Sequence, residues 1–137
     1  KNIIGGKPKS RKSNGSRTAY RFYTRQCSKL TELYHRFYRD GKKIVPETLE
    51  LDPLALSVWF MDDGSRCRAS DVYLNTQQFD NESQERLMKI LSKLNLQASL
   101  NKDKNYYRIR FIKSSLPTLI DLINIHIIPS MRYKIGL

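Results

Sequence analysis

The sequence contains little cysteine, little acid and no long apolar run. Its 2 cysteines, Cys27 and Cys67, form no CxxC pair and have no histidine at zinc-ligand spacing, so we expect neither disulfides nor structural zinc, and a reducing compartment. No stretch reaches the roughly 18 apolar residues of a membrane span, and we find no signal-peptide pattern. We therefore expect no membrane partner.

Acidic residues are outnumbered by basic ones. The chain has 25 Lys+Arg against 13 Asp+Glu, a formal charge of +12 and a pI of about 9.9. This balance favours a polyanionic partner such as nucleic acid. The 137 residues are enough for one domain with a genuine core. The first residue is Lys1 rather than Met, which we interpret as a sign of processing or of a fragment.

The most apolar stretch is residues 53–66, PLALSVWFMDDGSR. Asp52 is a good N-cap and Pro53 suits the first helical position, so we predict a helix from here to about the paired acids. Gly64 is a natural C-terminal stop.

Residues 58–61 are apolar on all sides of this helix, which predicts burial on most sides. The helix nevertheless ends on Asp62 and Asp63. Burying a carboxylate is costly, so another part of the chain or a ligand must compensate these charges.

The N-terminal part is basic and then alternating. Residues 5–16 are rich in Gly, Ser, Lys and Arg, which predicts a loop whose charges are free to bind phosphate. Residues 17–25 alternate as a half-buried strand does, and residues 28–39 have helical spacing that ends at Asp40 and Gly41. One face of the predicted strand carries Arg17, Ala19, Arg21, Tyr23 and Arg25.

The C-terminal part alternates strands and helices. We predict a strand over 71–77, a helix over 81–94, a hairpin of strands 97–101 and 106–112, and a helix over 114–128. In the first strand Val72, Leu74 and Thr76 point inward, and Tyr73, Asn75 and Gln77 outward. The hairpin exposes Gln97, Ser99, Asn101, Tyr106, Arg108 and Arg110.

A repeat is visible in the order strand, helix, loop, lysine, isoleucine. The first copy runs from Tyr20 to Ile44 and the second from Tyr107 to Ile135, about 87–91 residues apart. We therefore interpret residues 1–49 as the back end of a first repeat, with a basic loop, a strand and a helix. Residues 50–137 are interpreted as a complete second repeat.

The segment LSVWFMDDG, residues 56–64, resembles the nine-residue signature of the LAGLIDADG homing endonucleases. The G-K-K-I-V-P before it, the V-Y-L-N-T-Q after it and the M-R-Y-K near the C-terminus also resemble that family. The resemblance implies an α+β fold with an αββαββα repeat, a buried signature helix and a curved antiparallel sheet that lies in the DNA major groove. It also implies two signature helices, packed side by side, and a divalent metal, Mg²⁺ or another hard cation such as Mn²⁺.

The resemblance also implies roles for individual residues. Asp63 matches the metal-binding acid, and Asp62 precedes it with a carbonyl that can coordinate the metal. Lys134 matches the lysine near the scissile phosphate, Lys43 matches its first-repeat counterpart, and Gln77 lies where a side chain holds water or contacts a base. The family prefers small residues at the second and third signature positions, and here the third is Val58.

The outward faces supply side chains that suit DNA. Arg bridges guanine, Asn and Gln bridge adenine, and the remaining cations suit phosphate. The DNA-binding candidates are Lys7, Lys9, Arg11, Lys12, Arg17, Arg21, Tyr23, Arg25, Arg66, Arg68, Tyr73, Asn75, Gln77, Gln97, Ser99, Asn101, Arg108 and Arg110.

The leading hypothesis is a metal-dependent, sequence-specific double-strand DNA endonuclease. One alternative is an RNA-binding intron maturase that assists splicing, with intron RNA as partner; the other is a non-catalytic DNA-binding half-protein. The chain contains one signature helix and the chemistry calls for two, so we expect the second from another chain or from upstream residues. The expected location is intracellular, in an organelle or a prokaryotic cytoplasm.

Overall fold

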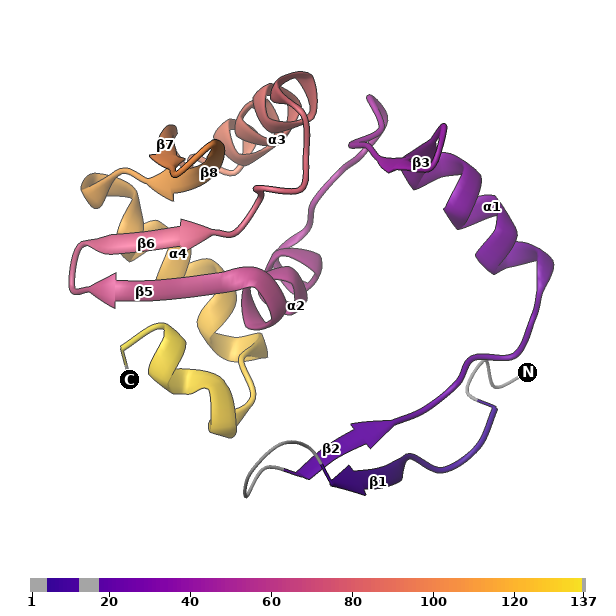
Figure 1. Ribbon diagram of the computed structural model, residues 1–137. Coiled ribbons are helices and arrows are strands. Elements are labelled where there is room, and N and C mark those ends of the chain that lie inside the picture. Colours follow the sequence, from indigo (N-terminus) through magenta and orange to yellow (C-terminus); the bar gives the residue numbers. More distant parts are fainter. Residues whose placement is uncertain (1–4, 13–17, 137) are drawn as a thin grey trace. The chain divides into compact units, whose positions relative to one another are not determined.

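The computed structural model describes residues 5–12 and 18–136. The chain divides into two compact units, residues 1–38 and 39–137, which are called here the first and the second unit. Figure 1 labels most of the helices and strands of each.

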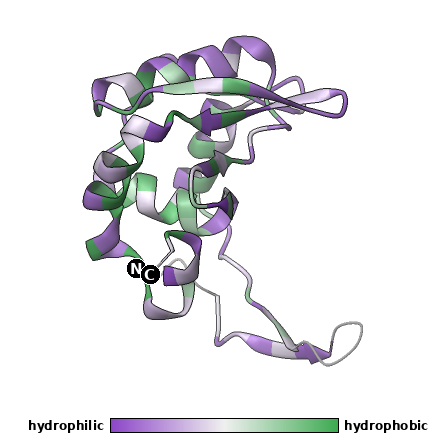
Figure 2. Cartoon of the chain, turned by 90° about the vertical axis from the view of Figure 1, so that its left-hand side faces the viewer, coloured by the Kyte–Doolittle hydropathy of each residue, from purple (hydrophilic) through white to green (hydrophobic). Residues whose placement is uncertain are grey.

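The first unit contains a hairpin and a helix. Strand β1 (Lys9–Lys12) pairs antiparallel with β2 (Thr18–Arg21), and helix α1 (Ser28–Phe37) follows. The expectation of a loop over 5–16 is wrong for β1, because Lys9 pairs with Arg21 in a ladder that the sequence pattern does not reveal. The predicted half-buried strand is also wrong, since β2 ends at Arg21 and all its residues are exposed. Figure 2 colours both strands mainly hydrophilic.

Helix α1 confirms the predicted helix and shows an exposed apolar side. Leu33 is 48% exposed and Tyr34 51% exposed, and α1 contains no buried residue. The ring of Tyr34 stacks on that of Tyr38, with 4.8 Å between centroids. Helices gain most of their stability by burying an apolar side, so α1 is weakly supported by the described contacts of its unit.

The second unit has the predicted αββαββα order. It runs through α2 (Pro53–Asp63), β5 (Gly64–Arg68), β6 (Asp71–Leu74), α3 (Asn81–Lys93), β7 (Ala98–Asp103), β8 (Tyr106–Phe111) and α4 (Leu116–Ile123). The strands form an antiparallel sheet in the order β5-β6-β8-β7. The αββαββα repeat implied by the family resemblance includes β5, but the residue pattern alone did not predict this strand. Two short strands, β3 (Tyr38–Arg39) and β4 (Lys42–Lys43), flank the turn at Asp40 and Gly41.

The core of the second unit lies between one face of this sheet and the helices. On β8, Ile109 and Phe111 are buried and Arg110 between them is partly exposed, as the pleat requires, whereas on β6 all of Val72, Tyr73 and Leu74 are buried. In Figure 1, α4 lies behind β5 and β6, and α3 crosses the top. The largest fully buried side chains are Phe60, Phe111, Leu56, Leu74, Leu91, Leu96, Ile109, Leu119 and Ile123.

Helix α2 begins as predicted. The carboxylate of Asp52 accepts a hydrogen bond from the backbone N–H of Ala55 at 2.7 Å, and Pro53 occupies the first turn. Helix α2 is buried on fewer sides than predicted. One side of it is exposed, because Leu54 is 54% exposed and Val58 55% exposed. Leu56, Ser57 and Phe60 face the core instead.

Helix α2 ends at Gly64 for a steric reason. Gly64 has an extended φ of −72°, so left-handed backbone is not what requires glycine there. A Cβ at this position would collide with the backbone carbonyl and the ring of Phe60. The chain can pass from helix to strand within one residue because Gly64 has no side chain.

The C-terminal segment is less helical than predicted. Its single predicted helix is α4, with 3₁₀ turns η1 (Lys113–Ser115) before it and η2 (Asn124–His126) after it. A further 3₁₀ segment, η3 (Pro129–Lys134), forms the tail. Across the part of the chain that the structure describes, no helix is long and apolar enough to cross a bilayer.

We predict that Gly64→Ala destabilises the protein by about 3 kcal/mol, because the new methyl group overlaps Phe60. Urea unfolding would measure the loss. Gly6→Ala is the matched control, since a Cβ at Gly6 meets nothing within 4 Å. Equal stability of the two variants would contradict the steric explanation.

We predict that Asp80→Ala costs about 1 kcal/mol, because the Asp80 carboxylate caps α3 by accepting the N–H of Ser83 at 2.8 Å. This hydrogen bond lowers the pKa of Asp80 from its usual 3.8. The stabilisation is thus present above 3.8 and disappears as the pH falls through the lower, folded pKa. Urea titrations across this range should show the advantage of wild type over Asp80→Ala shrinking in acid, whereas the advantage of Asp80→Asn over Asp80→Ala stays the same at every pH.

Candidate functional site

The C-terminal end of α2 carries two carboxylates. Asp62 is exposed and Asp63 is half-buried, and the last turn of α2 contains no basic residue. The free carbonyls at a helix C-terminus already create negative potential, so acids are unfavourable there. This end of the helix therefore requires positive charge from elsewhere.

Lys134 supplies part of that charge from the far end of the sequence. Its ammonium donates hydrogen bonds to the backbone carbonyls of Met61, at 2.6 Å, and of Asp62, at 3.3 Å. Lys134 thus caps α2 from outside the helix, a placement that favours a cation. The structure brings together Asp62, Asp63 and Lys134, three of the residues predicted from the sequence.

The Asp63 carboxylate is oriented by its own helix. The indole N–H of Trp59 donates to Oδ2 of Asp63 at 3.1 Å, one helical turn away. The backbone N–H of Asn75 donates to the carbonyl of Asp63 at 3.0 Å, which joins the end of α2 to the segment after β6. Trp59 was not predicted as a site residue, although its i, i+4 spacing from Asp63 was visible in the sequence.

The donor set suits a hard divalent cation bound jointly with phosphate. Among residues 5–12 and 18–136, no three His, Cys, Asp or Glu side chains gather into a metal site on their own. Mg²⁺ is normally held by one or two carboxylates together with substrate phosphates rather than by an all-protein cage. Asp63 and Asp62 fit that description.

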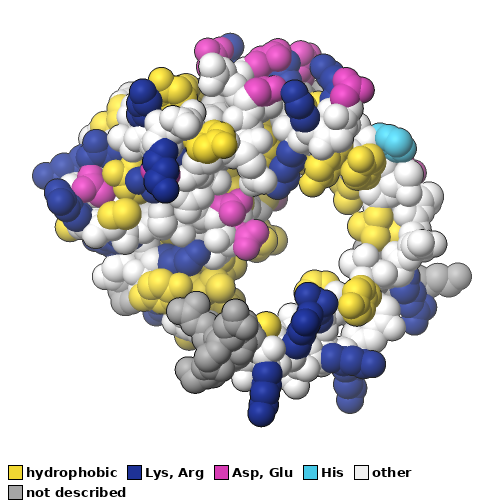
Figure 3. All heavy atoms as spheres, in the orientation of Figure 1, with side chains coloured by type: hydrophobic (Ala, Val, Ile, Leu, Met, Phe, Trp, Pro, Cys, Tyr) yellow, Lys and Arg dark blue, Asp and Glu magenta, His cyan; other side chains and the backbone are white. Residues whose placement is uncertain are grey.

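One face of the four-stranded sheet, called here the outer face, carries most of the DNA-binding candidates of the second unit. Residues paired across strands share a face, so Ser99, Arg110 and Tyr73 lie together, as do Asn101 and Arg108. A bulge between Arg66 and Arg68 puts Arg68 opposite Asp71 on this same face. Asn75 follows β6, and Gln97 precedes β7 and is exposed. Figure 3 shows several Lys and Arg side chains among hydrophobic ones at the left, and Asp and Glu mixed with Lys and Arg at the top.

Two arginines of the outer face are held by neighbours. Arg110 forms an ion pair with Asp71 at 2.5 Å, and the Arg108 guanidinium stacks over the Tyr73 ring at 3.9 Å. The predicted exposure of Tyr73 is wrong: it is 8% exposed, with Arg108 stacked over its ring. Asp71 was missed, because a lone carboxylate at the start of a strand is recognisable as an orienting group only when its cross-strand partner is known.

Arg66 lies on the opposite face. It pairs with Val72, whose side chain is in the core, so both point toward the helices. The Arg66 guanidinium donates to the carbonyl of Ile135 and, at 3.2 Å, to that of Ala69. The structure therefore gives Arg66 partners within the protein and does not group it with the other candidates.

Two further candidates make contacts away from the end of α2. The Gln77 amide donates to Oδ2 of Asp103 at 3.0 Å. The Lys43 ammonium lies over the ring of Phe79, 5.4 Å from its centroid. These contacts orient both side chains without joining either to Asp63.

The first unit places its candidates on and around the β1–β2 hairpin. Lys9, Arg11 and Arg21 share one face of it, and Lys12 lies on the other. Lys7, Tyr23 and Arg25 are exposed outside the strands, so the predicted common face of residues 17–25 is not formed. Arg17 lies outside the described residues.

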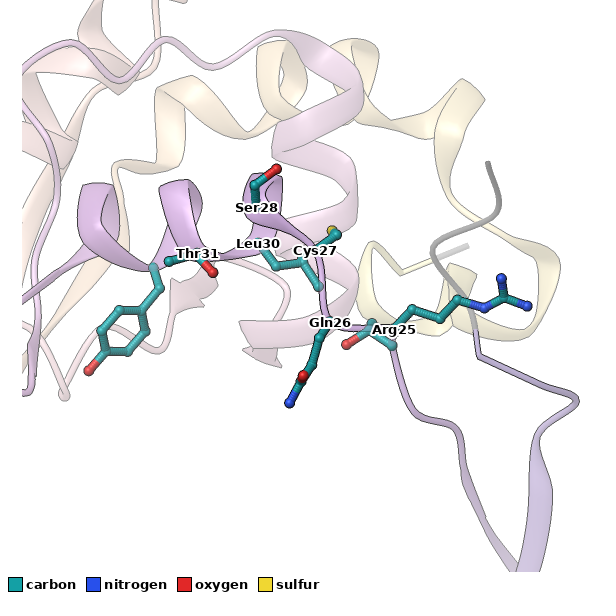
Figure 4. A pocket seen from close by; sticks show the side chains of 8 residues that line it. Arg25, Gln26, Cys27, Ser28, Leu30 and Thr31 are labelled. Atoms are coloured by element: carbon teal, nitrogen blue, oxygen red, sulfur yellow. The ribbon is translucent and has the colours of Figure 1, made fainter.

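An open cavity of about 620 Å³ adjoins the start of α1 in the first unit. Figure 4 shows Arg25 and Gln26 directed away from the helix, where the chain enters α1 at Cys27 and Ser28. Arg25 is the one charged side chain of its lining, which also contains Thr24, Leu30, Thr31 and Tyr34. Its lining contains no carboxylate or histidine for general acid–base catalysis, so the size of the pocket does not make it the site.

Known proteins resemble the chain over nearly its full length. The cytochrome b mRNA maturase bI2 of Debaryomyces hansenii is 32% identical over 130 residues, which cover 90% of this chain and 49% of the relative. The probable intron-encoded DNA endonuclease 3 of Mycosarcoma maydis is 28% identical over 131 residues, or 89% and 96%. The solved structure of the homing endonuclease I-WcaI bound to its DNA recognition sequence matches with a TM-score of 0.84 at 28% identity, covering 97% of this chain and 65% of that one.

The chain is shorter than some of the proteins that it matches. The chain spans about half of the D. hansenii maturase and about two thirds of I-WcaI. The sequence model of the LAGLIDADG DNA endonuclease family matches residues 1–119, most of the chain. The chain therefore belongs to the LAGLIDADG DNA endonuclease family.

Proposed function

We propose that this protein contributes one half of the active site of a sequence-specific, metal-dependent DNA endonuclease that cuts both strands. The observation that carries the proposal is the end of α2, where Asp63 is held by Trp59 and Lys134 caps the helix. The mixed fold, the family and the likeness to a homing endonuclease bound to its DNA support it.

The roles of the residues follow from their charges. Asp63, together with the carbonyl or carboxylate of Asp62, would hold Mg²⁺ or Mn²⁺. The cation, when bound, neutralises the phosphate and activates water. Trp59 fixes the Asp63 carboxylate, and Lys134, whose ammonium lies on the carbonyls of Met61 and Asp62 at the same helix end, would stabilise negative charge on the phosphate. We assign supporting roles to Gln77, which would hold water, and to Lys43 as a first-repeat lysine.

Sequence recognition is assigned to the outer face. Donors and acceptors for base edges come from Arg68, Arg110, Ser99, Asn101 and Gln97. Beside them lie Asn75 and Arg108, the latter stacked on Tyr73. The cations of the β1–β2 hairpin suit phosphate, whose contacts contribute salt-dependent affinity. We no longer assign DNA contact to Arg66, because it points toward the helices.

A second signature helix is required. The exposed apolar side of α2, with Leu54 and Val58, supports its packing against a similar helix. We propose that residues 1–49 are the back end of the repeat that would carry this helix; the order β1, β2, α1 repeats that of β7, β8, α4. The second helix would come from another chain or from upstream residues.

An RNA-binding maturase is the second candidate. It is supported by the D. hansenii relative named a cytochrome b mRNA maturase, which is 32% identical. The same basic surface would bind intron RNA. We propose an intracellular, organellar location on the strength of this relative and of the intron-encoded one from M. maydis.

We predict that Asp63→Asn abolishes cleavage by the completed enzyme while DNA affinity stays within about twofold, because the amide cannot neutralise the cation. A DNA target would first be selected from a library with the completed enzyme. Its cleavage and the dissociation constant of the enzyme–target complex would then be measured together. Asp121→Asn, an exposed carboxylate on α4, is the matched control. Full activity of Asp63→Asn would remove this residue from the mechanism, and splicing that survives the substitution would favour the maturase.

We also predict that the 137-residue chain alone does not cut both strands. One acidic helix end supports at most half of a composite site. Plasmid linearisation would be assayed with the chain alone and with a polypeptide that supplies a second apolar helix ending in Asp. Linearisation by the monomeric chain alone would refute the shared site, and tight binding without cleavage in the completed complex would favour a non-catalytic DNA-binding protein.

A further inference from the structure

Arg66 has two backbone partners that belong to different parts of the second unit. One is the carbonyl of Ala69 in the turn between β5 and β6, at 3.2 Å, and the other is the carbonyl of Ile135 in the tail. The guanidinium is planar and carries donors in a fixed fork, so it can bridge two acceptors in one geometry. Arg66 thereby ties the tail to the sheet.

The glycine after Ile135 makes this contact possible. A Cβ at Gly136 would occupy the place of the Arg66 guanidinium, and the φ of +80° at Gly136 also favours glycine. Ile135 itself is 3% exposed and packs in the core. The tail is thus fixed by a buried side chain and an arginine bridge at adjacent positions.

Ile135, which is fixed in this way, is the immediate neighbour of Lys134. From there the Lys134 ammonium reaches the carbonyls of Met61 and Asp62 at the end of α2. Arg66, Lys134 and Ile135 also line a cavity of about 30 Å³ with Phe60 and Val72. A lysine side chain has several rotatable bonds, so its ammonium is well placed only when its backbone is held.

We propose that Arg66 is a positioning residue for Lys134: its bridge to the Ile135 carbonyl holds the tail so that the Lys134 ammonium stays at the end of α2. The inference rests on the proposed function of Lys134 for its catalytic consequence, but not for the bridge itself. It replaces the sequence-based expectation that Arg66 contacts DNA.

The first experiment measures the position of Lys134 without any cleavage. The chain is treated with an acylating reagent, and the modification rate of each lysine is followed by mass spectrometry. In wild type, hydrogen bonds to two carbonyls shield the Lys134 amine. In Arg66→Ala its rate should rise by about tenfold, as expected for loss of one hydrogen bond to a charged group, while Lys89 and Lys93 on α3 stay unchanged.

Matched variants separate positioning from general loosening. Arg68→Ala, two residues along β5 and exposed, should leave the Lys134 rate unchanged. Arg66→Lys, which keeps the charge but not the fork, should give an intermediate rate, and it decides the question if Arg66→Ala does not fold. An unchanged Lys134 rate in a folded Arg66 variant, or an equal rise at all lysines, overturns the proposal.

The second experiment distinguishes positioning from DNA contact. The dissociation constant for duplex DNA of random sequence is measured against salt. Lys9→Ala, which removes a cation of the β1–β2 hairpin assigned to phosphate, should reduce the slope of log K against log salt by about one, whereas Arg66→Ala should leave it unchanged. A reduced slope in Arg66→Ala would make it a phosphate contact and overturn the inference.

In the completed enzyme, Arg66→Ala should lower kcat by about tenfold with KM unchanged. If the Lys134 modification rate rises but kcat does not fall, the bridge stands and the catalytic role of Lys134 fails. If the modification rate is unchanged, the bridge fails whatever the enzyme does.

Discussion

The structure depends on the compensation of negative charge at the C-terminal end of α2. Helix carbonyls and two adjacent carboxylates lie there, and the helix itself contributes no cation. An ammonium that donates hydrogen bonds there comes from Lys134, more than seventy residues along the chain. The tail, the sheet edge and the core must therefore be assembled before this helix end is stable, which links the site to the fold. Lys134 compensates only part of the negative charge at this helix end. The remaining charge would attract a further cation.

The sheet divides its arginines between two tasks through one extra residue. The bulge after Arg66 lets Arg66 point toward the helices and Arg68 toward the outer face, although alternation alone would give both the same side. On the outer face, Asp71 and Tyr73 hold Arg110 and Arg108, so these guanidinium groups would lose less conformational freedom in the proposed contacts with DNA. On the inner face, Arg66 acts on backbone carbonyls. Residue type alone does not distinguish these tasks; the register does.

The parts predictable from sequence were those with local signals. The Asp52 cap, Pro53 and the apolar run defined α2, and the helical spacing of residues 81–94 defined α3. Strand β5, GSRCR, has no apolar alternation, so its sequence does not predict a strand. It is a strand because it pairs with β6. The burial of Tyr73 and the exposure of Val58 likewise depend on neighbours distant in sequence. The family motif located Asp63 and Lys134, but their connection through the carbonyls of α2 required coordinates.

The exposed apolar side of α2 and its acidic end have a joint consequence. Leu54 and Val58 favour contact with another apolar helix, and such contact would bring two negative helix ends toward each other. Repulsion between them would oppose the apolar contact in the absence of cations. Each capping lysine reduces that repulsion, and a divalent cation between the ends would reverse it. In the proposed shared site, the cation therefore favours assembly of the two halves as well as hydrolysis, so metal affinity and pairing of the halves are thermodynamically linked.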